Sequence, residues 1–218
     1  MVSWRNVYLL MGIMALLLIV QFAMSTYRVR DAESAVRNRD APFTRKDFAR
    51  LFSEKPFVLL MASMFFGAAA QSGVIVWTLR YVSVYLNNAN AATACLSLFW
   101  VCSTISRFAS PYLPAKPQQV LGLGALIAGA AWLIALLINT PTAFLVACCV
   151  CGLACGPCIP MTLHVGTVLC PGKAGVSTGF LMIIKTIAQA AAPLIVASIM
   201  SMLNMRLAMQ ATTLFFLL

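Results

Sequence analysis

Residues 149–160 contain cysteines whose spacing is typical of redox chemistry. Cys151, Cys155 and Cys158 follow the C-x3-C-x2-C spacing with which radical enzymes of the S-adenosylmethionine type hold an iron–sulfur cluster, and thiolates are the usual ligands of such clusters. Residues 155–158 also read Cys-Gly-Pro-Cys, the redox loop of thioredoxin. Whether either chemistry is available depends on the elements that position these thiols.

The composition is that of a membrane protein. Apolar residues make up 62% of the 218 residues and charged residues only 9%, whereas soluble domains carry roughly 25% charged residues. Eight of the fifteen basic residues and all five acidic residues fall in residues 28–55. The net charge of +10 does not indicate nucleic-acid binding, because the basic residues lie in short loops between apolar runs. The expected electrostatic partner is the surface of the lipid bilayer.

The lengths of the apolar runs predict membrane-spanning helices. A hydrocarbon core about 30 Å thick is crossed by roughly 20 helical residues. A seventh apolar run begins near Leu207, and its roughly 12 residues are too few to cross unaided, so we expect a chain cut at its C-terminus. The sequence therefore predicts an all-α fold, a polytopic membrane helical bundle of six spans plus a truncated seventh. The six predicted spans are residues 6–27, 57–86, 91–113, 120–138, 143–169 and 174–203.

The charge of the loops predicts an orientation in the cytoplasmic (inner) membrane. Basic loops stay on the cytoplasmic side, so residues 28–55 are expected in the cytoplasm and the N-terminus outside. An outside N-terminus is what a missing upstream portion would produce. Basic and uncharged loops alternate along the chain: residues 28–55 are basic, 87–90 uncharged, the turn with Lys116 that follows Arg107 basic, 139–142 uncharged and 171–173 basic.

The membrane setting favours packing over redox chemistry for the cysteines. A thioredoxin loop lies between a strand and a helix, and a radical-enzyme cluster needs a soluble barrel, whereas Cys155 and Cys158 lie inside a long apolar run. Gly152 and Gly156 form a G-x-x-x-G surface that lets another helix approach closely. Pro157 and a second proline three residues later free backbone groups and should bend this helix. We therefore predict no metal, cofactor or catalytic residue here.

The segment before the second predicted span has a helix-start pattern of its own. Thr44 and Asp47 have the S/T-x-x-D/E spacing of a capping box. Phe48, Leu51 and Phe52 then recur at helical spacing on one face. The sequence predicts a short amphipathic helix within residues 28–55 that tethers two helical blocks.

This organisation resembles the major facilitator superfamily. Residues 1–27 resemble the sixth helix of that family, residues 28–55 its cytoplasmic central loop, and residues 56–218 its C-terminal half with a truncated last helix. Three short sequence motifs are most similar to those of the fucose permease and related sugar transporters. They are Gln71-Ser72-Gly73 with Trp77 and Tyr81, Ser106-Arg107-Phe108 at a helix end, and residues 156–160.

The resemblance implies that the ninth helix of the family faces lipid and that its neighbours line a cavity. Residues 120–138 accordingly carry no strongly polar side chain: besides glycine and Trp132 they are all aliphatic. The other predicted spans of that half carry polar groups. Lys185 is the strongest candidate contact because an ionised group near the bilayer centre is costly and usually functional. Gln189 lies one turn later on the same face. Alternatives for Lys185 are an interhelical pair with the missing half or a snorkelling side chain.

Other polar and aromatic residues complete the candidate site. Gln71 lies midway along its helix, and Trp77 could stack on a sugar ring or simply pack. Trp100 shares a face with Ser97, Thr104 and Arg107, which fits a cavity or a helix–helix seam. His164, the one histidine, is a candidate for proton coupling or a packing residue. The predicted hinge residues are Gly156, Pro157 and Pro160.

The resemblance implies secondary active transport of a small hydrophilic solute by alternating access. It favours a sugar or a polyol as the solute, whereas Lys185 without a local acid favours an organic anion. The expected partners are the solute, the bilayer, the missing N-terminal half, and a coupling proton or sodium ion. No acidic residue falls within a predicted span, so a coupling carboxylate would have to come from that half. Two alternatives are a half-size membrane protein acting as a homo-oligomeric transporter or scaffold, and a membrane thiol oxidoreductase using Cys155 and Cys158.

Overall fold

The computed structural model describes residues 8–9, 11–21, 53–112, 116–170, 174–202 and 205–217. The chain divides into two units, Met1–Thr44 and Arg45–Leu218. In the first unit, Met11–Gln21 is an apolar helix with exposed side chains. Both ends of the predicted first span, residues 6–27, lie outside the described residues. Most of the predicted loop 28–55 does too, including the amphipathic helix expected to begin near Thr44.

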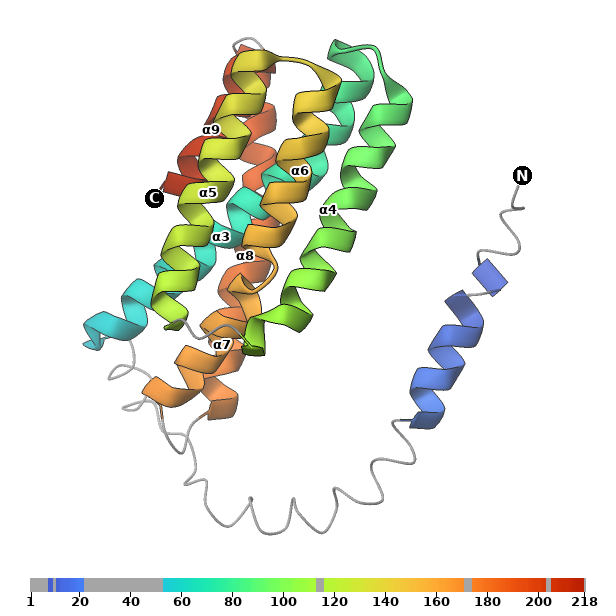
Figure 1. The fold of residues 1–218 in the computed structure, drawn as a ribbon. Helices are drawn as coiled ribbons and strands as arrows, with labels where there is room; N and C mark the ends of the chain where they lie inside the picture. Colours follow the sequence, from blue (N-terminus) through green and yellow to red (C-terminus); the bar gives the residue numbers. More distant parts are fainter. Residues whose placement is uncertain are drawn as a thin grey trace. The chain divides into compact units, whose positions relative to one another are not determined.

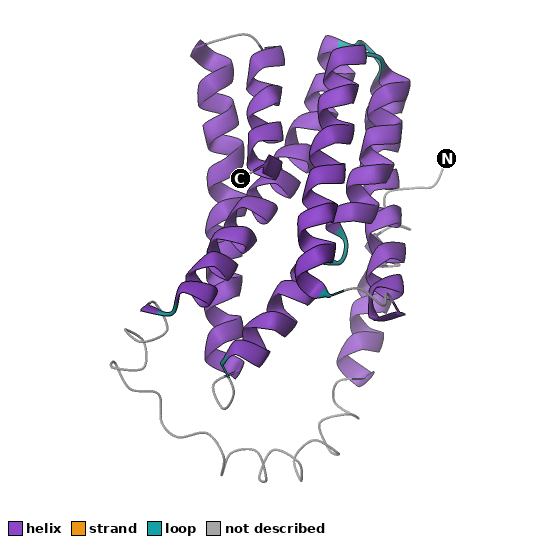
Figure 2. Ribbon diagram, turned by 60° about the vertical axis from the view of Figure 1, so that its left-hand side comes forward, coloured by secondary structure: helices purple, strands orange, loops and turns teal. Residues whose placement is uncertain are grey.

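The second unit is helical throughout its described elements, which confirms the predicted all-α bundle (Figures 1 and 2). The observed ends of the spans fall within three residues of the predicted ones. In chain order the elements are α3 (Lys55–Arg80) with a π-helical turn η1 (Tyr81–Tyr85), α4 (Ala89–Ala109) with a 3-10 turn η2 (Ser110–Tyr112), α5 (Pro117–Ile138), α6 (Pro141–Cys155), α7 (Cys158–Leu169), α8 (Ala174–Met202) and α9 (Met205–Leu217).

Among the described residues of this unit, five segments are long and apolar enough to cross a membrane. α6 and α7 count as one of these segments because they follow each other along a single path of 29 residues. α9 has 13 described residues. At about 1.5 Å per residue it is shorter than the hydrocarbon core.

The turn between α3 and α4 and the turn between α5 and α6 lie at the same end of the unit (Figure 1), and each contains an asparagine that shapes it. The Asn88 side chain accepts a hydrogen bond from the Ala91 N–H at 3.0 Å and caps the start of α4. Asn139 adopts a left-handed conformation with φ 56° at the end of α5. Its side-chain oxygen accepts from the Tyr81 hydroxyl at 2.7 Å. Arg206 of α9 donates to the Leu136 carbonyl at 3.0 Å, so this end ties α3, α5 and α9 together.

Small residues and aromatic rings set the packing. α6 packs against both α4 and α5, α3 packs against α8, and α9 contacts α3 and α5. Alanines of α3 and α8, among them Ala69 and Ala188, are buried against each other, and such small residues allow membrane helices to approach closely. The rings of Trp132 and Tyr81 lie 5.6 Å and 5.2 Å from that of Phe144 in the main core. The opposite face of α5 exposes aliphatic side chains, which suits contact with lipid.

Candidate functional site in the helical unit

The three spaced cysteines lie in the packed interior around the junction of α6 and α7. Cys151 and Cys155 are buried members of the main hydrophobic core. The Cys151 thiol lies 3.5 Å from the Ala128 carbonyl, and the Cys158 thiol lies 3.5 Å from that of Ala154. All eight cysteines are free thiols, and no three potential ligands converge on a metal position among the residues the structure describes. The thiols act here as small packing groups.

The two glycines beside them are in direct contact with the backbone of α4. A Cβ on Gly152 would collide with the Phe99 carbonyl oxygen, and one on Gly156 would lie 2.6 Å from the Ser103 carbonyl oxygen. Real Cβ atoms essentially never come so close to such an atom. The prediction that a second backbone lies against this glycine pair is therefore confirmed, and that backbone belongs to α4.

The helix that contains these residues is broken, as its prolines predict. α6 ends at Cys155 and α7 begins at Cys158, with Gly156 and Pro157 between them (Figure 2). Proline has no N–H, so Pro157 leaves the Leu153 carbonyl without its helical donor, and Pro160 does the same to the Gly156 carbonyl. A bare carbonyl inside a bilayer costs several kcal/mol, on the order of 2–7 by transfer measurements.

Side chains of α4 satisfy both freed carbonyls. Ser106 donates its hydroxyl to the Leu153 carbonyl oxygen. Arg107 donates its Nε–H to the Gly156 carbonyl oxygen at 3.2 Å. The sequence placed Arg107 on a face that fits a cavity or a helix–helix seam, but nothing in the sequence shows which carbonyl lies opposite it. In the structure Arg107 has a specific acceptor, the carbonyl of Gly156, which follows the neighbouring helix α6.

The same arrangement recurs on α8. Pro193 lies inside this helix and leaves the Gln189 carbonyl without its helical donor. Ser72 of α3 donates its hydroxyl to that carbonyl oxygen at 2.9 Å. This bond joins the two helices that carry most of the predicted solute contacts, since Gln71 precedes Ser72 and Lys185 lies one turn before Gln189.

The predicted contacts on α8 lie in the interior of the predicted span. Lys185 is half-buried and eleven residues from the start of α8, which places it about 17 Å along the helix axis. Gln189 is also half-buried. Within the described residues the single carboxylate side chain is that of Glu54, immediately before α3. The described part of the chain therefore gives the Lys185 ammonium no carboxylate at its own depth.

The other predicted contacts differ in their exposure. Gln71 and Trp77 of α3 are buried, 4% and 7% exposed. The guanidinium carbon of Arg80 lies 5.8 Å from the centre of the Trp77 ring, within the range of a cation–π contact. Trp100 of α4 is 44% exposed. His164 of α7 is exposed as well.

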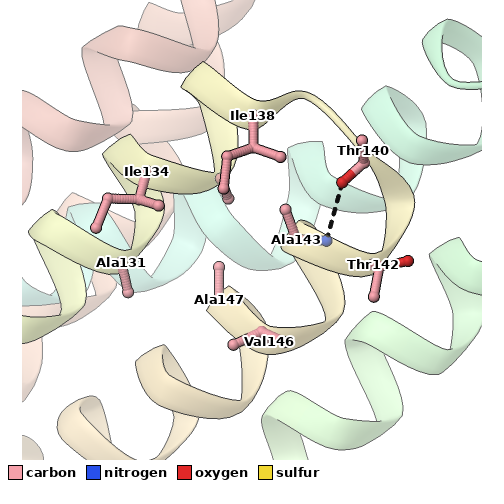
Figure 3. A pocket seen from close by; sticks show the side chains of 9 residues that line it. Ala131, Ile134, Ile138, Thr140, Thr142, Ala143, Val146 and Ala147 are labelled. Carbon is pink, nitrogen blue, oxygen red and sulfur yellow. Dashed lines mark hydrogen bonds between the residues drawn. The ribbon is translucent and has the colours of Figure 1, made fainter.

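A cavity of about 420 Å³ lies between α5 and α6 near the turn that joins them (Figure 3). Its lining is aliphatic apart from Thr140 and Thr142, and the Thr140 hydroxyl accepts a hydrogen bond from the Ala143 N–H at 3.3 Å. None of the predicted solute contacts lines it. The cavity is an apolar groove between two helices and not a site for a hydrophilic solute. Its remaining lining residues include Ala131, Ile134, Ile138, Val146 and Ala147.

Length, hydropathy and the helical packing define a multi-pass membrane protein. Comparison with family profiles then gives the family, because the Major Facilitator Superfamily profile matches residues 1–193. A search of curated proteins gives no significant match. The profile covers most of the chain, so the chain belongs to the Major Facilitator Superfamily, a family of membrane transporters and not of enzymes.

Proposed function

We propose that the protein carries a small hydrophilic solute across the cytoplasmic membrane by alternating access, with Lys185 as the main contact. The observation that carries this proposal is a half-buried ammonium group eleven residues into α8, whereas the one described carboxylate, Glu54, lies just before the start of α3. Family membership supports transport as the activity. A charge at the bilayer centre costs about 2.5–3.5 kcal/mol on insertion scales, so a lysine there implies a partner that offsets the cost.

The solute belongs to one of three classes: a sugar, a polyol or an organic anion. The described residues place no carboxylate at the depth of Lys185, and this favours an anion, because a carboxylate or phosphate group of the solute would pair with Lys185. Similarity to sugar transporters in Gln71-Ser72-Gly73 favours the two neutral classes. Gln189 would orient the solute by hydrogen bonds. Gln71 would do the same, while Trp77 and Trp100 would provide ring faces, although burial of Gln71 and Trp77 requires α3 to move before the solute reaches them.

The partner of this helical unit is the N-terminal half that the family resemblance implies. In such carriers the two halves rock against each other around a site near the bilayer midplane. Gly156, Pro157 and Pro160 are the proposed hinge of the α6–α7 segment. Coupling to protons or sodium ions completes the proposed cycle, with His164 as the candidate proton carrier on this side.

The proposed orientation places residues 28–55 in the cytoplasm of the inner membrane. The alternation of basic and uncharged loops supports it. The two uncharged turns, one between α3 and α4 and the other between α5 and α6, lie at the same end of the helical unit (Figure 1), as the proposal requires.

Uptake of labelled compounds tests the proposed function. Membrane vesicles from cells producing the protein are given a radiolabelled hexose, sorbitol or succinate, one from each class. We expect saturable uptake of at least one compound above that of vesicles without the protein. If uptake of all three stays linear with concentration and equal to the control, solute transport of this kind is contradicted.

A further inference from the structure

We propose that Ser106 and Arg107 clamp α4 to the break between α6 and α7, so that the end of α4 and the break move as one body. Their hydrogen bonds to the Leu153 and Gly156 carbonyls form this clamp, which we call the α4 clamp. The inference rests on the proposed function in making the α6–α7 segment a moving part, and it assigns two positioning residues to it.

The α4 clamp follows from the two prolines. Pro157 and Pro160 remove two donors within one turn, so two carbonyls of the same broken segment need donors from elsewhere. Both donors come from adjacent residues of one helix, and each is aimed at the carbonyl that one proline has freed. A helix break without such donors would expose bare carbonyls to a medium of low dielectric constant.

Backbone contact reinforces the hydrogen bonds. Gly156 lies so close to α4 that a Cβ would reach the Ser103 carbonyl at 2.6 Å and the Ser106 Cβ at 2.9 Å. α4 cannot slide along the break without losing this fit. Any motion of the break that keeps its carbonyls satisfied therefore takes the end of α4 with it.

The local conformation provides a specific test. Gly156 (φ −52°, ψ −52°) and Pro157 (φ −72°, ψ −17°) are already in the right-handed helical region. An alanine at position 160 can therefore donate its N–H to the Gly156 carbonyl with little rearrangement. The Gly156 carbonyl then no longer needs the hydrogen bond from Arg107. In the same way, alanine at position 157 would make Ser106 redundant.

Reaction of native thiols reports on the break without any knowledge of the solute. Cys155 is buried at the end of α6, and Cys158 is half-buried at the start of α7. N-ethylmaleimide is added to membranes containing the full chain, and modification of each thiol is followed by peptide mass spectrometry. Thiols react as thiolates and so need access to water. The measured rate therefore follows opening of the break.

We expect Arg107→Met to raise the modification rate of Cys158 about tenfold or more, since the lost bond involves a charged donor. In a Pro160→Ala background the same substitution should change the rate less than about twofold, the level expected for near-additive pairs. Pro193→Ala changes a proline of α8 and not one of the break. In that background Arg107→Met should therefore still raise the modification rate of Cys158 about tenfold or more. Lys116→Met is the matched control for charge, because it removes an exposed cation just before α5 whose side chain makes no hydrogen bond to the break.

The pair Ser106→Ala and Pro157→Ala repeats the test in case Arg107→Met does not fold. Equal effects of Arg107→Met with and without Pro160→Ala would overturn the proposal, and so would unchanged labelling of the single variant. Labelling that follows the expected pattern in a protein without solute uptake would keep the α4 clamp and reject the transport proposal. The two failures are therefore distinguishable.

Discussion

Replacing Gly152 with alanine is expected to destabilise the helical unit by about 2–3 kcal/mol or to prevent its folding, since overpacking of a tight interior usually costs about 1–3 kcal/mol. The new Cβ would collide with the Phe99 carbonyl oxygen and would lie 2.9 Å from the Cys102 Cβ. The carbonyl is backbone and cannot rotate away. α4 would have to separate from α6, and the hydrogen bonds of Ser106 and Arg107 would be lost with it.

The measurement is the midpoint of thermal unfolding of the detergent-solubilised protein. Gly122→Ala is the matched control, because Gly122 of α5 has no atom within 4 Å of a built Cβ. In a helix interior that change should be neutral or stabilising by up to about 1 kcal/mol. If Gly152→Ala and Gly122→Ala gave the same midpoint, the close α4–α6 contact would be wrong.

Replacing Lys185 with glutamine is expected to lower the transport kcat/KM by about ten- to a hundredfold, because hydrogen bonds to charged groups contribute about 1.5–3 kcal/mol. Glutamine keeps a hydrogen-bond donor but removes the positive charge. Lys185→Arg keeps the charge and should retain more activity than Lys185→Gln. The comparison uses the labelled compound that the wild-type protein takes up.

Thr186→Ala is the control for this second prediction. Thr186 follows Lys185 on α8 with an exposed side chain, and its hydroxyl donates to the Met182 carbonyl of its own helix at 2.9 Å. Its loss should leave uptake nearly unchanged. Wild-type uptake by Lys185→Gln at equal protein amounts in the membrane would remove Lys185 from the proposed site and favour an interhelical or snorkelling role.

The helices and their ends could be predicted because their signals are local. The length of each apolar run follows from the bilayer thickness. α5 and α6 begin at Pro117 and Pro141, two to three residues before the predicted starts at 120 and 143, because the prediction followed the apolar runs and did not use these prolines. The close approach at Gly152 and Gly156 was predictable as well, since two glycines four residues apart lie on one face of a helix. The π-helical turn η1 had no clear local signal, and the prediction simply continued α3 through it.

The partners across helices could not be predicted from the sequence. A proline shows which carbonyl is freed, but the donor depends on the rotation and height of the neighbouring helix. The sequence therefore indicated no hydrogen-bond partner on another helix for Ser72 and Ser106, and it placed Arg107 only on a face that fits a cavity or a helix–helix seam. For the same reason the sequence could not show that Trp77 is buried in the core while Trp100 is largely exposed. The predicted solute contacts remain predictions.

Counterflow by the purified protein tests alternating access most directly. Liposomes containing the protein are loaded with a high concentration of the unlabelled compound and diluted into a trace of the labelled one. A carrier of this kind exchanges the two, so the label should transiently rise inside the vesicles above its outside concentration and then fall. Label that only equilibrates, as through a pore, or that enters no faster than in protein-free liposomes, would contradict a carrier that alternates between two faces of the membrane.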